Sequence, residues 1–322
     1  MSNNSSNIDV PNGIVYFHYG ASPYARRITS MIMPRPELET LGVRYRRTPS
    51  MAVGRDVYID TRMILRRLEE LFPPSKAHPA LSSPETAGLA ALLNKFTIDA
   101  SVFSRAVQMM PSNRLKDERF VKDRAGFFGK GSTLQAALSR RPETIAHMRH
   151  LFDIAESLFA DGREWVAGTK AVSFADLEGV WAIDWFISDL EPPAEYFSEA
   201  LYPKVYGWRT RFRAALDAAR ARAPKPVSHK GTHAVKAILG ADFSDEGPTI
   251  DPQDPLGLQE GAVVKLFPMD GGGFMHEDKG RLVKLTKDEV AISVQAKTGQ
   301  EVRIHAPRWQ FRIQEVSAGS KL

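Results

Sequence analysis

The sequence of 322 residues contains no cysteine. This absence excludes a disulfide, a cysteine metal site, a thiol nucleophile and dithiol redox chemistry within the chain. If a reaction of this protein uses a sulfur nucleophile, a bound molecule must therefore supply it.

The sequence also has no long hydrophobic run and no strong excess of one charge. No apolar segment approaches the ~20 residues that a membrane helix needs. The N-terminal "MSNNSSNIDVPNG" lacks the basic and apolar regions of a signal peptide. The net charge is +5, and the basic residues are spread along helical segments, which is typical of solvated helix faces. We therefore expect a cytoplasmic protein that binds neither a membrane nor nucleic acid.

A first block, residues 13–78, alternates strand-like and helix-like segments. "IVYFHY" has the aromatic and branched residues of a strand, and "SPYARRITS" begins a helix with Ser as N-cap and Pro at the first helical position. Residues 50–59 have the pattern of a hairpin. Residues 61–72 have the pattern of an amphipathic helix. This order predicts a small domain that contains both strands and helices.

The rest of the chain divides into two further blocks and a connector. Residues 79–222 contain several apolar patterns with helical spacing, which predicts an all-helical domain. Residues 223–256 are rich in proline and indicate a linker. Residues 257–318 contain five short strands separated by glycine and charged turns, which predicts a small closed β-barrel of the SH3-like kind. The predicted fold class is a multidomain α+β protein.

Three segments in this order resemble a glutathione transferase. They are "YGASPYARR", "RRTPSMAVGRDVYIDTRMILRRLEELFP" and "VSFADLEGVW", and the resemblance covers about residues 13–220. The string "IMPRPELETLGVRYRRTPSMAVGRDVYIDTR" is similar to glutathione-transferase-like proteins of filamentous fungi, many of which are tied to secondary metabolism. The resemblance implies a thioredoxin-like domain, a helical transferase-type domain, a homodimer and a small hydrophobic substrate. The C-terminal barrel is not part of the common transferase fold.

The resemblance implies a glutathione site at two pairs of residues. Thr48–Pro49 matches the position of the family's cis-proline, where the preceding residue offers its backbone to the cysteinyl unit. Asp60–Thr61 matches the acidic and hydroxyl pair that holds the γ-glutamyl end. On physical grounds, Thr61 would cap the following helix, and Asp60 could bind the ligand ammonium through a charge-assisted hydrogen bond.

The resemblance also assigns catalytic and pocket residues. Ser22 matches the hydroxyl that activates the glutathione thiol, although an N-cap role alone would explain a serine there. Tyr24, in the first turn of the same predicted helix, is an alternative hydroxyl donor. Tyr19 and Arg26 could line the substrate pocket, and Arg26 could bind an anionic group. Trp185 could line the pocket as well, although its place on an apolar helix also fits the core.

The sequence departs from the family between Ser22 and Pro49. This stretch is shorter than the family needs, and the second half of the first helix and the second strand are missing from the pattern. Because the gap lies beside the expected glutathione site, two alternatives stay open. The fold could serve a glutathione-independent dehydratase, isomerase or cyclase, or it could be a non-catalytic assembly module.

Two further motifs concern folding and metal binding. Ser173–Phe174–Ala175–Asp176 matches the capping box of the family's central helix, with Asp in place of the commoner Glu or Gln. We assign it to folding. His147 and His150 lie one helical turn apart, but no acidic ligand set accompanies them, so we expect no metal site.

Overall fold

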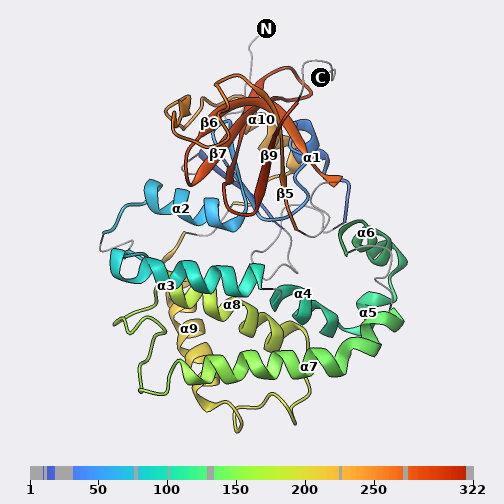
Figure 1. Cartoon of the computed structure of the whole chain (residues 1–322), viewed down its shortest axis with the longest axis vertical. Coiled ribbons are helices and arrows are strands. Elements are labelled where there is room, and N and C mark those ends of the chain that lie inside the picture. The colour runs from blue at the N-terminus through green and yellow to red at the C-terminus, as the bar shows by residue number, and fades with distance from the viewer. Residues whose placement is uncertain are drawn as a thin grey trace. The chain divides into compact units, whose positions relative to one another are not determined.

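The computed structural model divides into two compact units (Figure 1). One unit comprises residues 1–71, 126–129 and 226–322, and the other comprises residues 72–125 and 130–225. We call them the sheet unit and the helical unit. The structure describes residue 10 and the ranges 13–18, 32–75, 79–100, 102–128, 134–224, 227–270 and 275–316.

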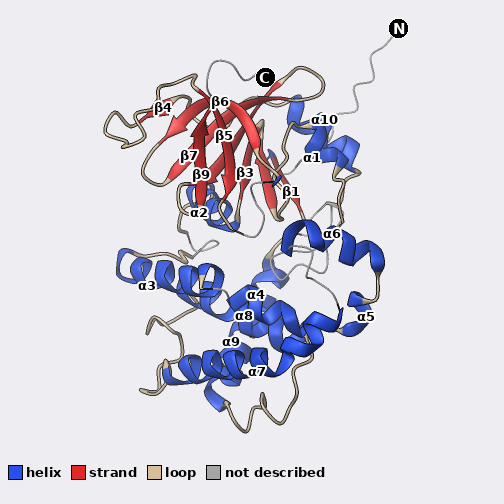
Figure 2. Cartoon of the chain, turned by 45° about the vertical axis from the view of Figure 1, so that its right-hand side comes forward, coloured by secondary structure: helices blue, strands red, loops and turns tan. Residues whose placement is uncertain are grey.

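The sheet unit is built on one mixed sheet (Figure 2). Its strands follow one another in the order β1, β2, β3, β8, β7, β6, β5 and β9, and β4 pairs with β6. Neighbouring strands are antiparallel except at β3–β8 and β4–β6, which are parallel. The strands are β1 (Ile14–Phe17), β2 (Ser50–Val53), β3 (Asp56–Ile59), β4 (Thr249–Ile250), β5 (Val263–Pro268), β6 (Asp278–Leu285), β7 (Glu289–Gln295), β8 (Glu301–Pro307) and β9 (Phe311–Glu315).

The prediction of a separate, closed C-terminal barrel is wrong. The five predicted strands are present as β5 to β9, but β8 pairs with β3 and joins them to the N-terminal strands in one sheet. The physical reason is that β3 would otherwise be an edge strand, with a row of unpaired N–H and C=O groups. The sequence pattern shows where strands lie but not which strand each one pairs with.

The two faces of the sheet bury different sets of side chains. Because side chains alternate along a strand, Val57 and Ile59 lie on one face of β3 and Tyr58 on the other. The Val57 face continues into the core formed by the C-terminal strands, and α1 (Pro36–Thr40) and α10 (Gly231–Leu239) contribute to that core. The Tyr58 face is covered by α2 (Thr61–Leu71). This helix begins two residues after β3 ends, so its first turn lies next to the end of β3.

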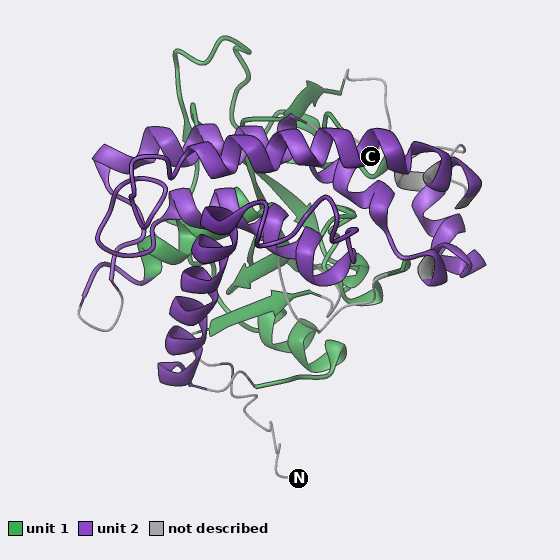
Figure 3. Cartoon of the chain, turned by 90° about the horizontal axis from the view of Figure 1, so that it is seen from below, with its two compact units in different colours: residues 1–71, 126–129, 226–322 green, residues 72–125, 130–225 purple. Residues whose placement is uncertain are grey.

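The helical unit is coloured purple in Figure 3. Its helices pack around α8 (Phe174–Asp189), which is buried or half-buried along most of its length. The predicted capping box is confirmed, and the Ser173 N–H donates to Asp176 Oδ2 at 2.9 Å. None of the helices in the described ranges has the length and apolar character needed to cross a membrane. The other helices of this unit are α3 (Pro84–Asn94), α4 (Val102–Ala106), α5 (Ser112–Leu115), α6 (Glu118–Phe128), α7 (Leu134–Ser157) and α9 (Pro203–Arg222).

Candidate functional site

The candidate site lies where the first three strands end at the same edge of the sheet. His18, Pro49 and Asp60 each lie one residue beyond the last paired position of β1, β2 and β3. The register of these strands therefore places the three residues in one row, with neighbours about 5 Å apart. We call them the strand-end row. The peptide bond between Thr48 and Pro49 is cis, as the resemblance implies.

Three polar side-chain atoms at this edge are buried without a hydrogen-bond partner among the described residues. They are His18 Nδ1, Thr48 Oγ1 and Ser50 Oγ. Buried polar atoms in proteins are nearly always hydrogen-bonded, so each such group suggests a partner outside the residues that the structure describes. The strand-end row and its neighbours therefore have unused capacity to bind a polar ligand.

His18 is the residue of this site that the sequence analysis missed. Its side chain is 8% exposed, and its ring centroid lies 5.1 Å from that of Tyr16. Burial lowers the pKa of His18 to about 4, so the imidazole is neutral at pH 7. A neutral imidazole carries one donor and one acceptor nitrogen. Its place at the end of an alternating strand, on the opposite face from Phe17, was the signal that could have identified it.

Asp60 caps α2, and the prediction that Thr61 does so is wrong. Asp60 Oδ1 accepts from the Arg62 N–H at 3.0 Å, and the Asp60 carbonyl accepts from the Ile64 N–H. Thr61 is instead the first helical residue. The reason is that aspartate is one of the strongest N-cap residues, so the cap lies one residue earlier than predicted. Asp60 has a φ of +72°, in the left-handed region that aspartate tolerates better than most residues.

The carboxylate of Asp60 is also paired with a guanidinium. Arg62 Nε donates to Asp60 Oδ1 at 2.8 Å, and Arg62 Nη2 donates to Asp60 Oδ2 at 2.8 Å. This two-pronged geometry is the strongest form of an arginine–carboxylate pair. An ammonium group that binds at Asp60 would have to share these oxygens with Arg62.

A second ion pair lies close to the first. Burial raises the pKa of the Tyr45 hydroxyl, Asp60 and Asp270 act in the same direction, and Arg47 and Arg62 oppose them. These four charged groups therefore act electrostatically on the same buried tyrosine. Arg47 Nη2 lies 2.7 Å from Asp270 Oδ1. The site thus presents two guanidinium groups and two carboxylates beside the cis peptide bond.

The structure does not test the predicted roles of five of the site residues. Ser22, Tyr24, Tyr19 and Arg26 lie outside the described residues, so their roles stay predictions. Trp185 lies on α8 in the helical unit, is 7% exposed, and stacks on Phe103 with 5.5 Å between the ring centroids. This packing fits a core position, and a role of Trp185 in a substrate pocket stays a prediction.

A second polar cluster of the sheet unit is centred on His305 of β8. Its Nδ1 lies 2.7 Å from Glu289 Oε1, its Nε2 lies 3.0 Å from Asp56 Oδ1, and its side chain is fully buried. Burial alone would lower the pKa of His305, but the hydrogen bonds to Asp56 and Glu289 outweigh that effect and raise it. Both ring nitrogens face carboxylate oxygens, so both must donate, and His305 joins β8 to β3 and β7 as an imidazolium.

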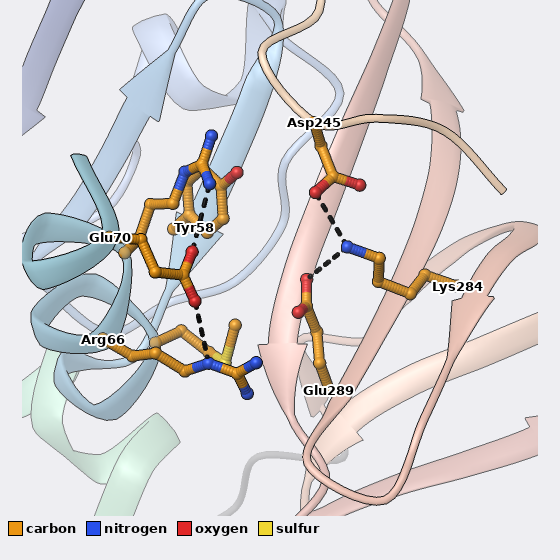
Figure 4. Close-up of a pocket in the computed structure, with 8 residues that line it drawn as sticks. Tyr58, Arg66, Glu70, Asp245, Lys284 and Glu289 are labelled. Atoms are coloured by element: carbon orange, nitrogen blue, oxygen red, sulfur yellow. Dashed lines mark hydrogen bonds and ion pairs between the residues drawn. The ribbon is translucent and has the colours of Figure 1, made fainter. Parts of the chain in front are cut away.

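A small pocket lies beside this cluster (Figure 4). Its volume is about 80 Å³, whereas pockets for metabolites are usually several hundred Å³. The cations on its wall are paired, since Lys284 Nζ lies 2.7 Å from Asp245 and 3.7 Å from Glu289. Arg66 and Arg67 both pair with Glu70. We therefore assign the His305 cluster and this pocket to holding the sheet together.

Comparisons with known proteins show the fold. Residues 105–221 match the model of a family described as a domain of unknown function, DUF7962. The structure is similar to the crystal structure of a GST-like protein from Pseudomonas syringae, with 22% sequence identity and a TM-score of 0.65. That similarity covers 95% of this chain and 100% of the other. No curated protein matches the chain. The chain therefore has a GST-like fold, in which the C-terminal strands extend the main sheet.

Proposed function

We propose that this protein is a glutathione transferase-like enzyme of secondary metabolism. It either conjugates glutathione to a hydrophobic, electrophilic metabolite or eliminates a leaving group from that metabolite. Glutathione would supply the thiol that a chain without cysteine lacks. The observation that carries the proposal is the set of buried, unpartnered polar atoms at the strand-end row, His18 Nδ1 and Thr48 Oγ1 above all.

The charged side chains around the strand-end row are complementary to the charged groups of glutathione, which is a tripeptide. Glutathione has two carboxylates and one ammonium group, and the site offers Arg47, Arg62, Asp60 and Asp270. In this proposal the guanidinium groups bind carboxylate oxygens, and Asp60 shares its oxygens between Arg62 and the ligand ammonium. The backbone of Thr48 holds the cysteinyl unit.

The thiol then needs a group that stabilises its ionised form. Ser22 is the proposed hydroxyl donor, and Tyr24 is the alternative donor on the same segment. A thiol with a pKa of about 8.5 is mostly protonated at neutral pH, so a hydrogen bond that favours the thiolate raises the fraction of nucleophile. The substrate would lie against Tyr19, Arg26 and Trp185, and we propose a homodimer.

A second candidate function rests on the Asp60–Arg62 pair. Because both oxygens of Asp60 already accept hydrogen bonds from Arg62, the ammonium site of glutathione is partly occupied. This observation favours a glutathione-independent dehydratase, isomerase or cyclase that binds its substrate at the same row. The two candidates differ in whether a thiol is required.

Calorimetric titration of glutathione into the full-length protein separates the two candidates. We expect binding at submillimolar concentration, and S-methylglutathione should also bind, since the charged groups and the Thr48 backbone contact other parts of the ligand. Absence of heat at millimolar glutathione would refute the first candidate. The second would be supported if a metabolite were turned over at the same rate with and without glutathione.

A further inference from the structure

Two arginines of the sheet unit contact the same aromatic ring. Arg55 lies in the turn between β2 and β3, and Arg303 lies on β8. Their guanidinium carbons are 4.1 and 4.0 Å from the centroid of Phe243, so the two carbons are at most about 8 Å apart. The main chain fixes this arrangement, because the Arg303 N–H donates to the Arg55 carbonyl and the Arg55 N–H donates to the Asp242 carbonyl.

The two guanidinium groups have unused donors. Arg55 Nε, Arg303 Nε and Arg303 Nη1 are buried and have no hydrogen-bond partner among the residues that the structure describes. Within the same residues, neither arginine forms an ion pair, whereas Arg62 pairs with Asp60. Two like charges held within about 8 Å of each other repel unless an anion lies near both.

Asp56 is a buried acid beside both arginines, since it follows Arg55 and pairs in register with Arg303. Its carboxylate is already in use. Oδ1 accepts from His305 Nε2 at 3.0 Å, and Oδ2 accepts from the Ser244 hydroxyl at 3.1 Å and from neighbouring backbone N–H groups. The hydrogen bonds that Asp56 accepts in the described structure therefore come from groups other than these two guanidinium groups.

Of the other nearby acids, Asp245 is half-buried and paired with Lys284 at 2.7 Å, and the remaining two are on the surface. Glu301 is exposed, lies two residues from Arg303 on the same strand, and accepts from the Ser293 hydroxyl at 2.8 Å. Asp242 is exposed, and its carbonyl rather than its carboxylate contacts Arg55. Among the described residues, N–H donors of both guanidinium groups are thus left for a ligand.

We propose that Arg55 and Arg303, whose guanidinium groups both contact the ring of Phe243, bind an oxyanion of the phosphate type. A guanidinium presents its N–H groups as a planar fork, and one carboxylate satisfies one such fork. Two forks around one aromatic ring match an anion with three or four acceptor oxygens. The ring fixes each guanidinium by a cation–π contact, so little side-chain freedom is lost on binding. This site is separate from the strand-end row and does not depend on its function.

The test is calorimetric and thermal-shift titration of the full-length protein with sodium phosphate, at ionic strength held constant with sodium chloride. The variants are Arg55→Gln and Arg303→Gln. The matched control is Arg312→Gln, an exposed arginine on β9 whose guanidinium contacts the sulfur of Met269. A parallel titration with glycerol phosphate distinguishes free phosphate from a phosphate ester.

We expect millimolar or tighter binding to the wild type and to Arg312→Gln, and a loss of about tenfold or more in each of the other two variants. Tighter binding of glycerol phosphate would identify an ester as the ligand, and equal or weaker binding would identify free phosphate. Equal thermal shifts in all four proteins, or no binding to the wild type, would overturn the proposal. If a glutamine variant does not fold, Arg55→Lys and Arg303→Lys replace it, because they keep the charge and lose the fork. Their affinity should also fall below that of the control.

Discussion

Nε2 of His305 lies 3.0 Å from Oδ1 of Asp56, although 249 positions separate the two residues in the sequence. This contact bridges β8 and β3, the pair of strands at which the C-terminal part of the chain joins the N-terminal strands. Both side chains have no exposed surface. The junction between the two parts of the sheet therefore contains a fully buried ion pair, and Glu289 provides a second carboxylate to the same imidazolium.

Replacement of His305 by glutamine should destabilise the protein strongly. The change leaves Asp56 and Glu289 buried without their cation, and removal of one partner of a buried pair costs about 3–5 kcal/mol. Urea unfolding at pH 6 measures the loss. The control is His233→Gln, at an exposed position on α10. A loss below about 1 kcal/mol would show that the network does not hold the sheet together.

The contribution of this network to the stability of the fold should decrease both at high pH and at low pH. His305 has a pKa raised above its ordinary 6.5, so its stabilisation is fully present below pH 6.5 and is lost as the pH rises through the raised value. Asp56 and Glu289 have pKa values lowered from 3.8 and 4.5, so their stabilisation is present above those values and is lost as the pH falls. The difference in melting temperature between wild type and His305→Gln should be largest between pH 4.5 and 6.5. A constant difference from pH 4 to 9 would contradict this.

The sequence was sufficient for features whose signals lie within a few residues. The capping box at Ser173–Asp176 was predicted because both partners lie in one turn. Its further contacts were not, since Asp176 Oδ1 also accepts from the Val166 N–H and from Trp208 Nε1. The cap of α2 was misplaced by one residue, because Asp60 and Thr61 are both good N-caps and local chemistry alone does not choose between them.

Features that depend on distant partners could not be predicted. Alternating residues identify β8 as a strand and place Arg303 and His305 on one face. They do not reveal that β3 is its neighbour, because any strand with matching faces could occupy that place. Consequently the sequence gives no sign that Asp56 and His305 form a pair. His18 was overlooked although its place at the end of an alternating strand was a local signal, because that place alone does not show that the side chain is buried.

Replacement of Asp278 by asparagine should stabilise the protein at neutral and higher pH. Asp278 is 2% exposed, and burial raises its pKa to about 7, although its Oδ1 accepts from the Arg44 N–H at 2.6 Å. The unfolded chain releases this proton near pH 3.8 and the folded chain near pH 7, so stability falls with pH between these values. For one proton the slope is at most about 1.4 kcal/mol per pH unit.

Asparagine at this position keeps the acceptor for the Arg44 N–H and carries no charge. Melting temperatures between pH 4 and 8 should therefore fall less steeply in Asp278→Asn than in the wild type. The matched control is Asp288→Asn, at an exposed position in the turn before β7, which should retain the wild-type slope. An unchanged slope in Asp278→Asn would mean that Asp278 ionises in the folded state at an ordinary pKa.

Replacement of His18 by phenylalanine should weaken glutathione binding without destabilising the fold. Phenylalanine keeps a ring beside Tyr16 but removes Nδ1, the buried nitrogen without a partner among the described residues. Since loss of an unpaired buried polar atom does not harm stability, the free energy of unfolding should stay the same or rise by up to about 1 kcal/mol. A hydrogen bond to the ligand contributes about 1 kcal/mol, so the dissociation constant should increase about fivefold. Calorimetric titration of wild type, His18→Phe and the control His233→Phe measures this change. Equal affinity in all three proteins would remove His18 from the site, and weaker binding with a large loss of stability would assign it a structural role instead.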